Sequence, residues 1–151
     1  NFLSYYEDKC FPYTMPISDI VGLRTAVDNV LADTEIYARH AKIAAATREA
    51  LTKAGLHLYL QSGYSNTVTV IEVPEGLTDQ AILSTMRDKY NVMISGCFDI
   101  LAGKVIRIGH MGENANEADL CMTLAAMDKT FEDLGYPLQC SMKEVFLKSL
   151  A

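Results

Sequence analysis

One arginine stands inside an apolar run at residues 104–112, which read KVIRIGHMG. The β-branched residues on both sides of Arg107 favour a strand, and the glycines that follow favour its end. Successive side chains of a strand point to opposite faces, so Arg107 can face a cleft while Ile106 and Ile108 face the core. A guanidinium stays charged and offers two parallel donors that fit a carboxylate. The pattern therefore predicts either an anion-binding arginine or a salt bridge.

The histidines are weaker candidates for chemistry. His110 follows the arginine strand, where an imidazole would contact a substrate, move a proton, or serve only as a polar strand end. His57 alternates outward on a predicted strand, and His40 lies in the middle of a predicted helix. We therefore expect the side chains of His57 and His40 at the surface.

The four cysteines, Cys10, Cys97, Cys121 and Cys140, form neither a CxxC pair nor a Cys/His metal pattern. Their spacing predicts no metal site and is typical of a reduced, cytoplasmic protein. Cys121 falls on the apolar face of a predicted helix, so we expect it in the core.

The length and composition predict one globular domain, because a chain of 151 residues can form its own hydrophobic core. Half of the residues are hydrophobic, and no run approaches the roughly 18 apolar residues that a membrane helix needs. The formal net charge is −6 and the basic residues are scattered. This distribution argues against nucleic acid as a partner.

Apolar periodicity predicts helices that alternate with short strands. The predicted helices span residues 18–31, 36–54, 79–90, 116–134 and 142–150. The predicted strands span residues 56–60, 67–73, 91–95 and 104–109. The expected caps are Ser18, Thr78, Asn114 or Asn116, and Ser141 at N-termini, and Gly55 at a C-terminus. This order of helices around a small sheet predicts a two-layer α+β domain.

Several segments together resemble one enzyme family. They are PYTMPIS at 12–18, TVTVIEVPEG at 67–76, MISG at 93–96 and GKVIRIGHMG at 103–112, the last followed by an amphipathic helix. Their order resembles the C-terminal part of class V pyridoxal-phosphate-dependent aminotransferases, and most closely the alanine–glyoxylate and serine–pyruvate aminotransferase group. The resemblance covers nearly the whole chain.

The resemblance implies the small domain of a fold type I enzyme, with a short, mostly antiparallel sheet covered by helices and a long N-terminal helical pair. Residues 1–17 would form an interdomain, phosphate-side segment, and residues 18–151 the C-terminal aminotransferase domain. The large domain and its Schiff-base lysine would lie upstream, so this chain is expected to hold no catalytic residue and to be inactive alone. The whole enzyme would be a homodimer that uses pyridoxal 5'-phosphate to transfer an amino group between an amino acid and glyoxylate or pyruvate.

The resemblance also implies two binding sites. Arg107 corresponds to the arginine that binds the substrate α-carboxylate. Thr14 corresponds to a threonine that, with an aromatic hydroxyl, reaches the cofactor phosphate of the neighbouring subunit. Some relatives have a tyrosine three residues earlier, where this chain has Phe11, so Tyr13 is the candidate for that hydroxyl. The alternative is that Tyr13 and Tyr5 only pack.

Two other functions stay open. Class V also contains cysteine desulfurases, whose nucleophilic cysteine lies on a loop shortly before the equivalent arginine strand, as Cys97 does here. The SGSAC and RHHC contexts of those cysteines are absent from this chain. The other alternative is a free-standing α+β module that binds an amino acid through Arg107.

Overall fold

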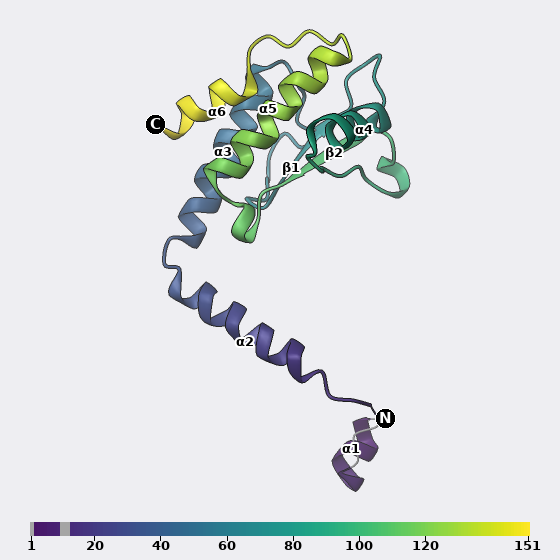
Figure 1. The fold of residues 1–151 in the computed structure, drawn as a ribbon, viewed down its shortest axis with the longest axis vertical. Helices are drawn as coiled ribbons and strands as arrows, with labels where there is room; N and C mark the ends of the chain where they lie inside the picture. The colour runs from purple at the N-terminus through teal and green to yellow at the C-terminus, as the bar shows by residue number, and fades with distance from the viewer. Residues whose placement is uncertain (1, 10–12) are drawn as a thin grey trace. The chain divides into compact units, whose positions relative to one another are not determined.

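The chain folds into two compact units in a computed structural model that describes residues 2–9 and 13–151 (Figure 1). One unit ends at Ile36, and the other runs from Tyr37 to Ala151. Cys10 and Phe11 lie outside the described residues. The predicted division into residues 1–17 and 18–151 concerns the whole enzyme and stays a prediction.

The first unit contains the helices α1 (Phe2–Asp8) and α2 (Ile17–Ala32). The first long helix is therefore confirmed, but the prediction of Ser18 as its N-cap was wrong. The helix begins earlier, after Pro16, whose carbonyl accepts a hydrogen bond from the Ile20 N–H. The backbone of Pro16 itself is not helical (φ −79°, ψ 63°), and its side chain makes no capping hydrogen bond.

Helix α2 buries none of its side chains in the described part of the chain. Its exposed apolar residues are Ile17, Ile20, Val21, Leu23, Val27, Val30 and Leu31. Most helical stability in proteins comes from packing an apolar face against a neighbour. The described first unit therefore provides no such packing for α2.

The sheet of the second unit is short and antiparallel. It pairs β1 (Val68–Glu72) with β2 (Val105–Gly109), and Val70 lies opposite Arg107 in the register. The β-branched sequences of both segments favour strands, because these side chains pack well on a pleated surface. The predictions of a strand at 67–73 and of one at 104–109 are therefore confirmed.

The other two predicted strands were wrong. Residues 56–60 and 91–95 each contribute only one isolated bridge, and these bridges are Leu58–Ile71 and Ser95–Arg107. Both segments follow directly after a helix, and their first turns are formed by Gly55 (φ +90°) and Asn91 (φ +54°) in the left-handed region.

Four helices flank the sheet, with two short 3₁₀ turns in the loops. They are α3 (Ile36–Lys53), α4 (Asp79–Tyr90), α5 (Glu117–Asp133) and α6 (Met142–Leu150), with η1 (Asp99–Leu101) and η2 (Gly112–Asn114). The side chains of Thr78, Asn116 and Ser141 each accept a hydrogen bond from the backbone N–H three residues later. These N-caps are as predicted, and Asn116 rather than Asn114 opens α5 because Asn114 belongs to η2.

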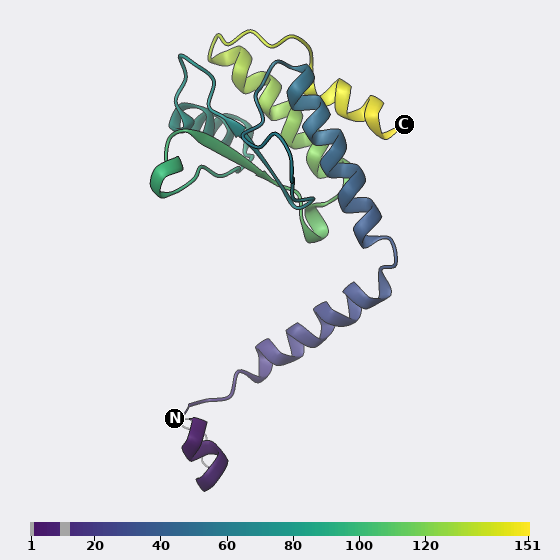
Figure 2. The ribbon, with the colours of Figure 1, turned by 180° about the vertical axis from the view of Figure 1, so that it is seen from behind.

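The core of the second unit lies between the strands and the helices. Helix α5 packs against both α4 and α6, and Figures 1 and 2 show α3, α5 and α6 on the same side of the strands. The largest fully buried side chains include Leu51, Ile71, Ile82, Met86, Ile106, Ile108, Phe131 and Phe146. This arrangement confirms the predicted α+β fold with a short antiparallel sheet. None of the helices in the described ranges is both long and apolar enough to cross a membrane.

Candidate functional site

Arg107 occupies the centre of β2. Its backbone N–H donates to the Ser95 carbonyl at 2.7 Å, and its carbonyl accepts from the Ser95 N–H at 3.2 Å. The neighbours Ile106 and Ile108 are buried in the core, whereas Arg107 is half-buried. The predicted alternation is therefore confirmed, and the strand directs the arginine away from the isoleucines.

The guanidinium of Arg107 contacts the loop that precedes its strand. Its Nε donates to the Gly96 carbonyl at 2.7 Å, and its Cζ lies 5.8 Å from the centroid of the Phe98 ring. No carboxylate of residues 2–9 or 13–151 forms an ion pair with Arg107, and its Nη1 and Nη2 donate no hydrogen bond within those ranges. Both Nη groups are thus available for an anion, and paired guanidinium donors fit a carboxylate.

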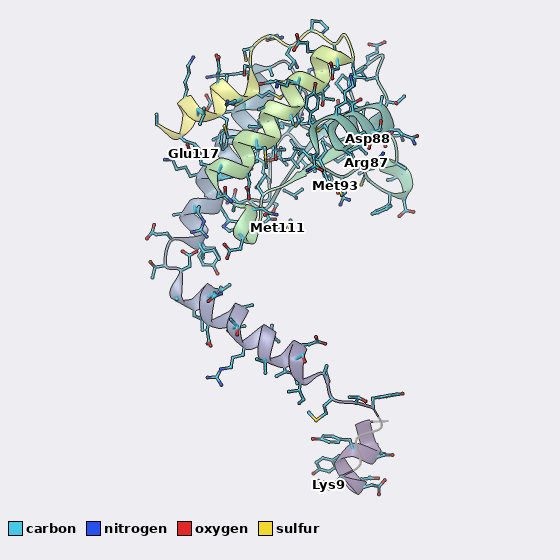
Figure 3. All side chains as sticks on the ribbon, viewed as in Figure 1. Lys9, Arg87, Asp88, Met93, Met111 and Glu117 are labelled. Carbon is cyan, nitrogen blue, oxygen red and sulfur yellow. The ribbon has the colours of Figure 1, made fainter. Side chains whose placement is uncertain are left out.

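A second arginine on α4 provides a contrast. Arg87 forms an ion pair with the adjacent Asp88 at 2.7 Å, on an exposed surface where Figure 3 labels both residues. The Asp88 carboxylate raises the pKa of Arg87, and Arg87 lowers the pKa of Asp88. Arg87 Nε and Nη2 both donate to the Asp88 carboxylate, which distinguishes this arginine from Arg107.

The loop before β2 lies close against the start of α4. A Cβ atom on Gly96 would lie 3.4 Å from both Asp79 Oδ2 and Leu83 Cδ1, which is close van der Waals contact with the side chains of α4. Cys97 follows in the same loop as a half-buried free thiol. The fold thus brings Cys97 into the segment that contacts Arg107, and its proposed role in a desulfurase stays a prediction.

His110 is fully buried rather than presented to a substrate. Its Nδ1 lies 3.2 Å from the Asn66 carbonyl, and its Nε2 lies 2.8 Å from the Thr69 hydroxyl. A carbonyl can only accept, so Nδ1 donates and Nε2 accepts from Thr69. Burial lowers the pKa of His110, because it disfavours the charged imidazolium. His110 does follow the end of β2, as predicted, but it joins that end to β1 and to the loop before β1.

The predicted surface position of His40 was wrong. His40 is buried, and its Nε2 accepts a hydrogen bond from the Gly112 N–H at 3.0 Å. The segment after β2 folds back against α3, a long-range contact that helix periodicity does not contain. His57 is exposed, as predicted, and Cys121 is partly buried against the core.

The residues predicted to bind the cofactor phosphate lie in the first unit, before α2. The Thr14 side chain is exposed, and Tyr13 is 76% exposed. Neither hydroxyl forms a hydrogen bond within the residues that the structure describes. Histidine, cysteine, aspartate and glutamate side chains in the same ranges form no group of three that could hold a metal ion.

Sequence reasoning missed Gly96 and Phe98, the two residues that contact the Arg107 guanidinium. A glycine and an aromatic residue in a loop carry no sequence signal for such a contact. Only the bridge between Ser95 and Arg107 brings this loop beside the arginine.

The chain is similar to known proteins over almost its whole length. It is 36% identical to an uncharacterized aminotransferase of Methanocaldococcus jannaschii, in an alignment that covers 97% of this chain and 40% of that protein. It is also 36% identical to the serine–glyoxylate aminotransferase of Arabidopsis thaliana, with 91% of this chain and 35% of that protein covered. No family model matches the chain.

The fold is similar to part of a solved enzyme. The crystal structure of pyridoxamine–pyruvate aminotransferase from Mesorhizobium loti superposes with a TM-score of 0.86 and 32% sequence identity. The match covers 95% of this chain and 38% of that chain. The present chain thus spans between 35% and 40% of the length of these three relatives.

Proposed function

Because this chain belongs, with its homologues, to the class V group of aminotransferases, we propose that it forms part of an enzyme that transfers an amino group between an amino acid and a small 2-oxo acid. Two of the relatives are named for glyoxylate and pyruvate, which supports these oxo acids as the acceptors. The proposal includes a homodimeric, cytoplasmic enzyme in which a further part of the protein carries the lysine that anchors the cofactor.

The observation that carries the proposal for this chain is the hydrogen-bonding state of Arg107. Its Nε donates to the Gly96 carbonyl, while Nη1 and Nη2 have no hydrogen-bond partner within residues 2–9 and 13–151. In the proposed enzyme these two groups bind the carboxylate of the amino acid and of the oxo acid. Fixing the carboxylate orients the carbon that gains or loses the amino group, which lowers the entropic part of the barrier.

The proposed cofactor of the whole enzyme is pyridoxal 5'-phosphate. Thr14 and Tyr13 fit its phosphate chemically, because both offer exposed hydroxyl donors that are not engaged elsewhere in the described chain. We expect them to bind the phosphate held by the neighbouring subunit. When bound, the cofactor supplies the electron sink that amino-group transfer needs. Arg107 then holds the substrate, while the two hydroxyls help to retain the phosphate.

An activity assay on the full-length enzyme that contains this chain tests the proposal. The enzyme, loaded with pyridoxal phosphate, is offered a panel of amino acids with glyoxylate or pyruvate as the acceptor. We expect glycine to form from glyoxylate or alanine from pyruvate. With a thiol reductant present to release persulfide sulfur, formation of sulfide and alanine from cysteine that depends on Cys97, without amino transfer, would support a desulfurase instead. Amino acid binding without any reaction would support a binding module.

The isolated 151-residue chain should form no specific covalent adduct with pyridoxal phosphate. The anchoring lysine is proposed to lie in another part of the enzyme, so only weak, scattered reaction with surface lysines is expected. Borohydride reduction followed by peptide mass spectrometry measures this directly. One adduct per chain at a single lysine would contradict the proposed division of the site.

Replacing Thr14 by valine in the full-length enzyme should weaken cofactor binding by about 10-fold, because one hydrogen bond to a charged phosphate is lost. The dissociation constant of the cofactor measures the effect. Thr25→Val is the matched control, since Thr25 lies in α2 and its hydroxyl donates to the Val21 carbonyl within the same helix. Equal cofactor affinity in Thr14→Val and Thr25→Val would remove Thr14 from the phosphate site.

A further inference from the structure

One of the three guanidinium nitrogens of Arg107 is fixed by the chain itself. The Nε–H group donates to the Gly96 carbonyl at 2.7 Å, which is at the short end of the range for N–H···O bonds. A single hydrogen bond sets the direction of the Nε–H group. The guanidinium plane is still free to turn about that bond, so a second contact is needed to fix where Nη1 and Nη2 point.

The Phe98 ring provides a second contact. The Cζ of Arg107 lies over this ring, 5.8 Å from its centroid, within the distance over which a cation is attracted to an aromatic face. The Phe98 side chain is 75% exposed. Burial in the core therefore does not explain an aromatic residue at this position, whereas contact with the guanidinium does.

Both contacts come from one tightly held segment. Gly96 follows Ser95, whose backbone pairs with that of Arg107, and Phe98 directly precedes the turn η1. The Phe98 carbonyl accepts a hydrogen bond from the Leu101 N–H at 3.1 Å, which closes that turn. The backbone on both sides of Phe98 is thus fixed, and the ring is presented to Arg107 from a defined position.

We propose that Phe98 is a positioning residue for Arg107. Its ring and the Gly96 carbonyl together fix the guanidinium plane, so that Nη1 and Nη2 meet a carboxylate ligand side by side. This inference rests on the proposed function, in which the ligand is the carboxylate of an α-amino acid or a 2-oxo acid. Phe98 acts through the arginine and does not itself bind the ligand.

Nuclear magnetic resonance on the ¹⁵N-labelled chain tests the contact without any need for activity. Phe98→Leu keeps an apolar side chain but removes the aromatic face, so the ring-current shift of the Arg107 Nε–H signal should disappear. Exchange of that proton with solvent should become about 2- to 5-fold faster. Phe98→Tyr should preserve both properties. The control is Ile100→Ala, because Ile100 lies in the same loop and is 81% exposed. An unchanged signal in Phe98→Leu, or an equal change in Ile100→Ala, would overturn the proposal.

Kinetics of the full-length enzyme test its consequence. Phe98→Leu should lower kcat/KM for the amino acid by about 2- to 5-fold, whereas Phe98→Tyr should have almost no effect. In an Arg107→Ala background, Phe98→Leu should cause no further loss, because the two residues act as one unit. A loss that persists without Arg107 would show that Phe98 acts elsewhere. If the parent enzyme transfers no amino group, the proposed function fails. The spectroscopic test still shows whether Phe98 positions the Arg107 guanidinium, because it does not depend on activity.

Discussion

Replacing Arg107 by alanine in the full-length enzyme should lower kcat/KM for the amino acid by at least about 10-fold, because two charge-assisted hydrogen bonds to the carboxylate are lost. Arg107→Lys keeps the charge but loses the paired geometry, so it should recover only part of the activity. Steady-state kinetics with varied amino acid concentration measure both effects. The loss should fall on carboxylate-bearing substrates, while amines that lack the carboxylate should react equally poorly with either enzyme.

The matched control for this experiment is Arg87→Ala. Arg87 is also an arginine of the second unit, but its guanidinium is paired with Asp88 at an exposed position. This variant should keep normal kinetics, and a solvent-exposed pair contributes little to stability. The proposed role fails if Arg107→Ala lowers thermal stability and leaves the amino acid kinetics unchanged. Arg107 would then be a structural residue that supports the loop through Gly96.

A second large effect is expected at His110. Replacing His110 by alanine should lower the free energy of unfolding of the second unit by about 3 kcal/mol. The substitution leaves a cavity and leaves two buried polar groups without their hydrogen-bond partner. The Thr69 hydroxyl and the Asn66 carbonyl would lose the hydrogen bonds that now join the end of β2 to β1 and its preceding loop. Urea unfolding at pH 8, followed by circular dichroism, measures this change. The matched control is His57→Ala, because His57 is exposed.

The pH dependence of unfolding gives His110 a specific signature. Burial lowers its pKa below the ordinary value of 6.5, so the unfolded chain takes up the proton first as the pH falls. Its contribution to stability is therefore fully present above pH 6.5 and is lost as the pH falls from there through the folded-state pKa. The carboxylates with lowered pKa, such as Glu49 and Asp133, lose their contribution only below 4.5 and 3.8. A stability curve between about pH 5 and 6.5 that has the same slope in His110→Ala and in the parent chain would contradict this assignment.

Local sequence signals determined where most elements begin and end. Thr78, Asn116 and Ser141 cap their helices because a side-chain oxygen placed at that position satisfies a backbone N–H that the helix leaves unpaired. The alternation of Ile106, Arg107 and Ile108 set the faces of β2, since strand parity follows from neighbouring residues alone. The order of the motifs along the chain also identified the family resemblance, which the homologues confirm.

Only the tertiary structure decided which distant groups meet. Residues 56–60 and 91–95 have strand-like sequences, yet each forms a single bridge, because strand pairing depends on how a segment packs against its neighbours as well as on its own residues. The sequence predicted a surface position for His40. In the structure the segment after β2 folds back against α3, and the Gly112 N–H donates to the His40 imidazole.

The candidate site shows the same division. The sequence by itself determined that an arginine would stand on one face of a strand, because the period of that strand is local. The tertiary structure decided the contacts of the Arg107 guanidinium. The Gly96 carbonyl accepts from Nε and the Phe98 ring lies beside Cζ, and the pairing of Ser95 with the strand brings both residues there. Contacts of this kind follow from how separate segments pack together, and residue type and spacing along the chain do not encode them one by one.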